Sequence, residues 1–215
     1  MKDVIIFGDS YSTFEGHIPE GYATYYCPNG REQGPAVTKM DVDSTWWKQF
    51  VDLFGVNLFL NNSWSGSTIG YTGYNNADCS KSSSFIYRYK KLKGEGFFER
   101  NTIDTVFVFG GTNDSWSGAP LGEMKYANWE EKDLFNVLPA ICYFAHTLKT
   151  DLPNANIVFI INTEIKEEIQ TAIETAASYY GAKSIRLRDI DKECGHPTVK
   201  GMEAICKQVA EGLKQ

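Results

Sequence analysis

Three glycine-containing polar segments of this sequence each follow a short apolar run, and a histidine stands close to the C-terminal end. The segments are residues 8–10 (Gly-Asp-Ser), residues 61–68, which contain Gly66, and residues 111–114 (Gly-Thr-Asn-Asp); the histidine is His196. Acyl transfer requires a hydroxyl nucleophile, an imidazole that accepts its proton, and hydrogen-bond donors directed at the developing oxyanion. These residue types therefore predict ester hydrolysis through a serine.

Each of these groups can be assigned a role from its chemistry. Ser10 is the expected nucleophile, and His196 is the expected general base. The oxyanion would be held by the backbone N–H groups of Ser10 and Gly66 and by the side-chain amide of Asn113. Glycine suits position 66 because a Cβ would hinder close approach of the substrate to the backbone. Asp114 is expected to fix its own loop by local hydrogen bonds.

The elements that must position these groups follow from hydrophobic patterning. Short apolar runs rich in strand-forming residues predict strands at residues 4–7, 56–60, 105–109, 156–161 and 185–187. Helical spacing of apolar residues, or a helix-stop signal, predicts helices at residues 44–54, 130–148, 163–180 and 198–213. This alternation predicts an α/β protein with a parallel sheet covered by helices on both faces. The carboxyl ends of parallel strands share one edge, so the polar segments should meet over one pocket.

Local signals place several helix ends. Ser44 is expected to cap the first helix, and Gly55 is expected to close it. Gly181 should end the helix over residues 163–180. Pro139 lies inside the stripe over residues 130–148, so a kink is expected there.

Two long segments show neither a helical nor a strand period. Residues 11–43 and 70–96 are rich in aromatic and polar residues, and we interpret both as irregular loop insertions. Loops of this length in a compact domain are commonly functional rims, so we expect them to wall the pocket above Ser10. With no linker or repeat in the sequence, residues 1–215 are predicted to form a single domain.

Composition excludes several classes of function. The net charge of −6 argues against a nucleic-acid partner or an anionic membrane surface, and no apolar run is long enough to span a membrane. The five cysteines show no CxxC pair, which favours reduced thiols. No metal or organic cofactor is implied. No signal peptide precedes the first strand, so we expect a cytoplasmic protein, with a secreted form whose leader has been removed as the alternative.

The four motifs together resemble the SGNH (GDSL-type) hydrolase family. Residues 8–11, 62–66 and 111–114 and the His-Pro pair at residues 196–197 appear in the family's order over nearly the whole chain. The resemblance implies a flavodoxin-like three-layer α/β/α sandwich with a five-stranded parallel sheet. It also implies a serine esterase with the site residues assigned above, without the Gly-x-Ser-x-Gly elbow of α/β-hydrolases.

One position departs from the family's pattern. The family usually places an aspartate three residues before the histidine, whereas this sequence has Glu193 there. Our first choice for the group that orients His196 is the Glu193 carboxylate, and Asp191 is the second. A dyad in which a backbone carbonyl or a water orients the imidazole is the third possibility.

These inferences predict a carboxylic-ester hydrolase that works through an acyl-enzyme. Short acyl groups, acetyl above all, on carbohydrate or on a small molecule are the expected substrates, because aromatic side chains of the insertions can stack on sugar rings. Lysophospholipid or thioester hydrolysis is the enzymatic alternative. A catalytically inactive glycan-binding module on the same fold is the alternative from another class, and the departure at position 193 favours it. The sequence does not predict the oligomeric state.

Overall fold

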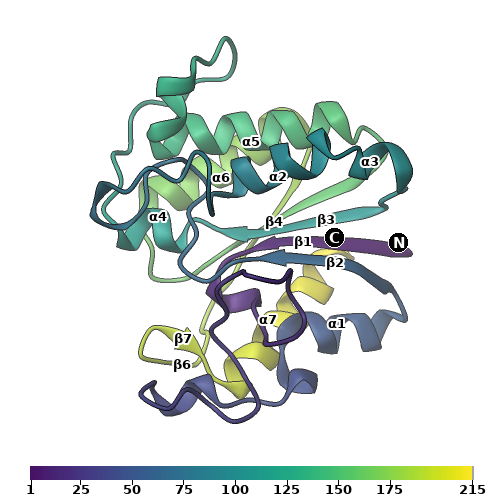
Figure 1. Ribbon diagram of the computed structural model, residues 1–215. Helices are drawn as coiled ribbons and strands as arrows, with labels where there is room; N and C mark the ends of the chain where they lie inside the picture. The colour runs from purple at the N-terminus through teal and green to yellow at the C-terminus, as the bar shows by residue number, and fades with distance from the viewer. Residues whose placement is uncertain (215) are drawn as a thin grey trace.

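The computed structural model of the chain describes residues 1–214 and has a five-stranded, all-parallel sheet at its centre (Figure 1). The strands lie in the order β2-β1-β3-β4-β5. Their bounds are Asp3–Gly8 for β1, Asn57–Ser63 for β2, Thr105–Gly110 for β3, Asn156–Ile161 for β4 and Lys183–Arg186 for β5. This is the flavodoxin-like strand order, in which the direction of winding reverses between β1 and β3.

Helices cover both faces of the sheet and make it the middle layer of an α/β/α sandwich. In Figure 1, α2, α5 and α6 lie on one face, and α1 and α7 lie on the other. The helices are α1 (Trp46–Phe54), α2 (Phe85–Gly94), α3 (Phe97–Arg100), α4 (Thr112–Trp116), α5 (Val137–Asp151), α6 (Glu167–Tyr180) and α7 (Val199–Gly212). The fold class predicted from the sequence is confirmed.

The strands supply two hydrophobic cores because alternate residues point to opposite faces of a sheet. In β1, Ile5 and Phe7 pack into the core beneath α2, α5 and α6, whereas Val4 and Ile6 pack into the core beneath α1 and α7. All four side chains are at most 1% exposed. The continuous apolar run at the start of the chain is therefore explained by burial on both faces.

Several predicted helix ends need adjustment. Thr45, and not Ser44, caps α1 by accepting a hydrogen bond from the Lys48 N–H, and Gly55 closes the helix in the left-handed conformation as predicted. Pro139 does not kink a longer helix, because α5 begins at Val137. The proline thus lies in the first turn, where its missing N–H leaves no intrahelical partner unsatisfied.

The prediction that residues 70–96 are irregular is wrong for the second half of that segment. Residues Phe85–Gly94 form α2, which Ser84 caps by accepting from the Tyr87 N–H. Phe85 and Tyr89 are buried in the core and therefore cannot wall a pocket. The helix was missed because its buried face carries a charged residue, Arg88, between hydrophobic ones, which interrupts the apolar stripe expected of a core helix.

Residues 11–43 contain only short 3-10 turns and isolated bridges, as expected, but they are not merely a rim. Tyr11, Phe14 and Tyr26 lie in the core beneath α1 and α7. The Tyr26 hydroxyl donates to the Pro197 carbonyl at 2.9 Å, which joins this segment to the C-terminal part of the chain. Among residues 1–214, no helix has the length and apolar character needed to cross a membrane.

Candidate active site

Ser10 follows β1 at the carboxyl edge of the sheet, beside the point where the strand order reverses. Asp9 caps a short 3-10 turn over residues 10–12 by accepting the Tyr11 N–H at 3.0 Å. A Cβ at Gly8 would lie 2.5 Å from the Ser63 side-chain oxygen, so only glycine fits at the end of the strand. These constraints hold the serine at the sheet edge with 3% of its surface exposed.

His196 reaches Ser10 from a small β-hairpin that the sequence patterns did not predict. Strands β6 (Lys192–Glu193) and β7 (His196–Pro197) are joined by two residues, Cys194 and Gly195, with φ of 50° and 76°. Positive φ at both central residues is typical of the tight turn that suits a two-residue hairpin. The hairpin places His196 Nε2 3.0 Å from Ser10 Oγ.

A backbone carbonyl faces the other imidazole nitrogen. His196 Nδ1 lies 3.1 Å from the carbonyl oxygen of Cys194. Because a carbonyl can only accept a hydrogen bond, Nδ1 must carry the proton in the neutral ring. Nε2 then presents its lone pair to the Ser10 hydroxyl, and this is the tautomer that a general base needs.

Within residues 1–214 no carboxylate lies within hydrogen-bond distance of His196, whereas Glu193 was our first choice for the group that orients it. Glu193 is directly opposite His196 in the hairpin register, yet its exposed side chain makes no hydrogen bond to the imidazole within residues 1–214. The Asp191 carboxylate accepts a hydrogen bond from the Thr198 hydroxyl at the start of α7 instead. The tight turn directs the Cys194 carbonyl at His196 Nδ1, so this carbonyl occupies the place at Nδ1 that a carboxylate would take.

Aromatic and cationic groups surround the imidazole. Tyr25 stacks on the His196 ring with centroids 3.6 Å apart and planes 8° apart, and Trp116 packs edge-on at 5.7 Å. Burial lowers the pKa of His196, and the positive charges of Lys192 and Arg31 lower it further, against the opposing effect of the Cys194 carbonyl. Burial and the two nearby positive charges thus favour the neutral form of the imidazole.

The expected oxyanion donors lie at the carboxyl ends of β1, β2 and β3. Gly66 adopts φ of 80°, a left-handed conformation that favours glycine, and a Cβ there would meet no atom within 4 Å. The Asn113 amide donates to the Ser67 carbonyl at 3.0 Å and accepts from the Tyr74 hydroxyl at 2.9 Å. These two contacts fix which way the amide points and leave one of its two hydrogens for an incoming oxygen.

From the sequence we expected Asp114 to fix its own loop. In the structure its side chain instead holds the loop that follows β2. Its carboxylate accepts the backbone N–H groups of Ile69 and Gly70 at 2.9 to 3.2 Å. Burial raises the pKa of this carboxyl to about 6, although the backbone donors oppose the rise. The loop of Gly66 is consequently anchored to the segment that carries Asn113.

Comparison with known proteins decides the family. The family model described as GDSL-like lipase/acylhydrolase matches residues 2–213. The chain belongs to this family. It is therefore an ester hydrolase of the serine esterase class. A comparison with curated proteins gave no match.

Solved structures of GDSL-like proteins superpose over the whole chain. A GDSL-like lipase from Bacteroides ovatus shares 40% identity with a TM-score of 0.89, over 100% of this chain and 98% of that chain. One from Bacteroides uniformis shares 42% identity with a TM-score of 0.89, over 100% and 96%. A family two carbohydrate esterase from Clostridium thermocellum shares the fold at 15% identity, with a TM-score of 0.66 over 99% of this chain and 63% of that chain.

The rim of this GDSL-like site is aromatic, and tyrosines of both predicted insertions contribute to it together with two tryptophans from outside them. Tyr22 packs against Trp64 with ring centroids 4.3 Å apart, which joins the segment after β1 to the loop after β2. Tyr74 and Trp116 are each 41% exposed beside Asn113 and His196. The sequence allowed a backbone carbonyl at His196 and placed Tyr25 in an expected wall, but it did not single out Cys194, the stacking of Tyr25 on the imidazole, or Trp116. Only the Cys-Gly pair gave a local signal, because a two-residue turn with glycine second is typical of hairpins.

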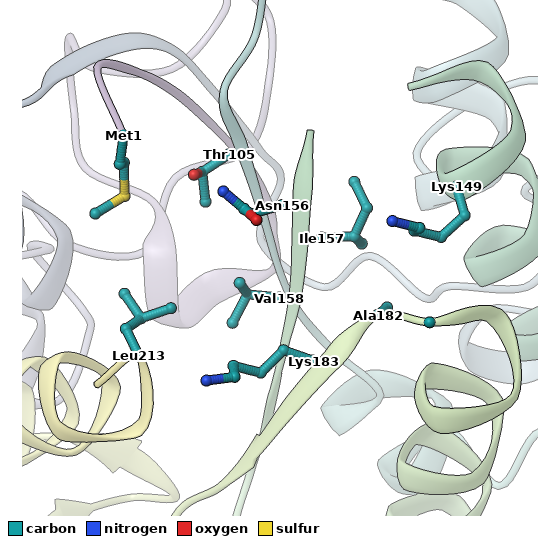
Figure 2. Close-up of a pocket in the computed structure, with 10 residues that line it drawn as sticks. Met1, Thr105, Lys149, Asn156, Ile157, Val158, Ala182, Lys183 and Leu213 are labelled. Carbon is teal, nitrogen blue, oxygen red and sulfur yellow. The ribbon is translucent and has the colours of Figure 1, made fainter. Parts of the chain in front are cut away.

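The cavity in Figure 2 lies at the other end of the sheet and is not the active site. It has a volume of about 490 Å³ and is lined by Thr105 and Asn156, the first residues of β3 and β4, and by Lys149 and Lys183. Ligands of open α/β sheets bind at the carboxyl ends of the strands, where Ser10 lies. Among residues 1–214, no group of three or more His, Cys, Asp or Glu side chains could hold a metal ion.

Proposed function

We propose that Ser10 and His196 form a catalytic dyad that hydrolyses esters through an acyl-enzyme. The Cys194 carbonyl takes the place of the carboxylate that is the third member of a Ser-His-Asp triad. The contact of 3.0 Å between Ser10 Oγ and His196 Nε2 carries the proposal. The tautomer fixed by the Cys194 carbonyl supports it, because that tautomer leaves Nε2 free to accept the proton.

The proposed reaction has two steps with the same groups. Ser10 Oγ attacks the ester carbonyl carbon while its proton passes to His196 Nε2, and the negative oxygen is held by the Ser10 and Gly66 N–H groups and the Asn113 amide. The imidazolium then returns that proton to the departing alcohol oxygen, which leaves an acyl-Ser10 ester. A water then loses a proton to Nε2 and attacks the carbonyl carbon of this ester. The imidazolium returns the proton to Ser10 Oγ as the bond between Oγ and the acyl carbon breaks, which releases the acid and restores the Ser10 hydroxyl.

The Cys194 carbonyl can stabilise the imidazolium, because a carbonyl dipole accepts the Nδ1–H in both charge states. A dipole stabilises the cation less than a full negative charge does. The surrounding positive charges of Lys192 and Arg31 also oppose protonation. We therefore infer that the oxyanion donors supply most of the stabilisation of the transition state.

For the substrate we propose an acetyl ester on carbohydrate. Tyr74, beside Asn113, and Trp116, beside His196, are each 41% exposed, and aromatic rings can stack on sugar rings. Two proteins of the same fold are described as an acetyl xylan esterase and as a family two carbohydrate esterase in complex with cellohexaose. At 16% and 13% identity they support the fold alone, so the rim carries the substrate proposal.

The experiment compares ester cleavage by the wild type, Ser10→Ala and His196→Ala. We expect wild type to cleave 4-nitrophenyl acetate and to take up one fluorophosphonate per chain, located on Ser10 by peptide mass analysis, and we expect both variants to lose turnover. Ser178→Ala, an exposed serine on α6, serves as the matched control. Wild-type activity in Ser10→Ala, or an adduct on Cys194, would refute the dyad.

The substrate is tested separately on acetylated oligosaccharides. We expect acetate release from acetylated xylo- and cello-oligosaccharides, and kcat/KM that falls from 4-nitrophenyl acetate to octanoate. A maximum at octanoate would favour the lysophospholipid or thioester alternative. Binding of cellohexaose without turnover of any ester would favour the inactive glycan-binding module, for which the absence of a carboxylate at His196 is the supporting observation.

A further inference from the structure

We propose that Arg88, buried on α2, is a positioning residue that holds the three loops of the oxyanion hole in register. The inference rests on the proposed function of Ser10 and His196. Arg88 does not contact the reacting atoms; it acts through the backbone of the loops that do.

The surroundings of Arg88 are unusual for a charged side chain. It is 0% exposed, and within residues 1–214 no carboxylate lies within ion-pair distance of its guanidinium. Burial lowers the pKa of Arg88 to about 9, which the charge of Asp9 partly offsets. Charges are rarely buried unless each donor finds an acceptor, so the contacts of this group should explain its presence.

Each part of the guanidinium has a specific acceptor. Nε donates to the Ser83 carbonyl at 2.8 Å, and one terminal nitrogen donates to the backbone carbonyl and, at 3.0 Å, the side-chain oxygen of Asn62. The other terminal nitrogen donates to the Gly8 carbonyl at 3.2 Å and to the Ser67 hydroxyl at 3.1 Å. The planar fork thus joins α2, β2, β1 and the loop after β2.

These acceptors stand next to the groups that would bind the oxyanion. Gly8 is the last residue of β1 and lies two positions before Ser10. Ser67 follows Gly66, and its carbonyl accepts the Asn113 amide at 3.0 Å. One guanidinium therefore sets the relative positions of all three proposed donors.

The geometry requires arginine rather than any cation. A guanidinium offers five N–H donors in a rigid plane, whereas a lysine ammonium offers three donors at one point on a flexible stem. Figure 1 shows α2 on the same face of the sheet as α5. From this helix, the hydrogen bonds of Arg88 reach Asn62 of β2 and Gly8 of β1. Lysine at this position could reach Gly8 or Asn62, but it could not span to Ser67 as well.

The test compares Arg88→Lys and Arg88→Met with Tyr89→Phe as the matched control. Tyr89 is the next residue of α2, is equally buried, and donates to Asp151 at 2.8 Å away from the proposed site. We measure the folded fraction, kcat and KM for 4-nitrophenyl acetate, and the inhibition constant of a boronic acid, which forms a tetrahedral adduct with an active-site serine.

We expect kcat of the Arg88 variants to fall about ten- to a hundredfold per folded molecule, because small misplacements in an active site cost up to about a hundredfold. KM should change little, and the boronate inhibition constant should rise by a similar factor. Tyr89→Phe should lower thermal stability and leave kcat unchanged. If Arg88→Met does not fold, Ser67→Ala, which removes one acceptor, should give a smaller loss of kcat that does not add to that of Arg88→Lys.

Arg88→Lys that folds with the kcat of wild type, or losses of kcat that vanish when corrected for the folded fraction, would overturn the inference. A rise in KM with unchanged kcat would also overturn it, since that pattern indicates ground-state binding. Ser10→Ala separates this failure from failure of the proposed function. If Ser10→Ala is inactive while the Arg88 variants behave as wild type, the dyad stands and only the role of Arg88 falls.

Discussion

The oxyanion side of the active site is held by buried charged groups on α2 and α4, whereas the histidine side is held by a two-residue turn at the surface. On the first side, Arg88 and Asp114 hold the loops of Gly66 and Asn113 from within the protein. On the second side, the carbonyl of Cys194, an exposed residue, is the one partner of His196 Nδ1 in the described part of the chain, residues 1–214. The two sides therefore differ in the groups that hold them. Charged side chains, Arg88 and Asp114, hold the oxyanion side, whereas a neutral backbone carbonyl orients the histidine.

The histidine hairpin is anchored to the rest of the protein by hydrogen bonds at both of its strands and at its turn. The Lys192 ammonium donates to the Thr163 hydroxyl at 2.6 Å and to the Asn162 side chain at 3.2 Å, which ties the hairpin to the end of β4. The Tyr11 hydroxyl donates to the Gly195 carbonyl, and that of Tyr26 to the Pro197 carbonyl. In this site, buried side chains fix the donors for the oxyanion, whereas the backbone of the turn orients the histidine.

Of the variants that test the difference between the two sides, we expect the largest loss of kcat from one on the oxyanion side. Asn113→Ala should lower kcat about 10²- to 10³-fold, the usual loss when one oxyanion donor is removed, with little change in KM. Asn156→Ala, at the opposite edge of the sheet beside the cavity of Figure 2, is the control and should retain wild-type kcat. Stopped-flow or steady-state kinetics on 4-nitrophenyl acetate measure both. A loss below threefold would show that Asn113 is not a donor.

The next largest effect is expected from the turn that aims the Cys194 carbonyl. Gly195→Ala would place a Cβ 2.9 Å from the Trp116 ring at a residue with φ of 76°, so the turn must shift. We expect kcat to fall about tenfold or more, because such backbone strain costs about 1–3 kcal/mol and is relieved by moving the carbonyl.

Gly181→Ala is the control for strain in the left-handed conformation. Gly181 has φ of 71° at the end of α6, and a Cβ there would meet nothing within 4 Å. This variant should lose stability, measured as the free energy of unfolding, without losing kcat. Equal kcat values for the two glycine variants would indicate that the position of the Cys194 carbonyl does not matter.

A smaller effect is expected in the pH dependence. The pKa of His196 is lowered by burial first and then by nearby positive charges, so the acid limb of kcat/KM should lie below pH 6.5, where an ordinary histidine titrates. Arg31→Gln removes one of these charges and should move the acid limb to higher pH. Arg100→Gln, on the surface of α3, is the control and should not move it. An acid limb that does not respond to Arg31→Gln would mean that it reports another group.

The sequence alone predicts some elements of the fold and of the site, and misses others for physical reasons. The positions of β1, β3 and β4 followed from apolar runs, which are local patterns with one physical interpretation. The pairing of Ser10 with His196 was expected from the chemistry of acyl transfer and from the resemblance to the SGNH family, and the two side chains lie 3.0 Å apart. The helix α2 did not follow, because its buried face carries Arg88. The choice between a carboxylate and a carbonyl at Nδ1 depends on the conformation of Cys194, which no hydrophobic pattern encodes.

The smallest effect is expected at Glu193, where a carboxylate triad would give one of the largest. Loss of the acid from a triad costs about 10⁴-fold in kcat. Here Nδ1 faces the Cys194 carbonyl and the Glu193 side chain is exposed, so Glu193→Gln should change kcat by less than about twofold, in line with the weak effect of a charge in water. Asp191→Asn should likewise spare kcat, but it should lower stability because Asp191 accepts from Thr198 at the start of α7. Kinetics and thermal unfolding of the two variants, measured side by side, test both statements. A hundredfold loss in Glu193→Gln would mean that the carboxylate reaches His196 during turnover, and the two sides of the site would then no longer differ in how charge is supplied.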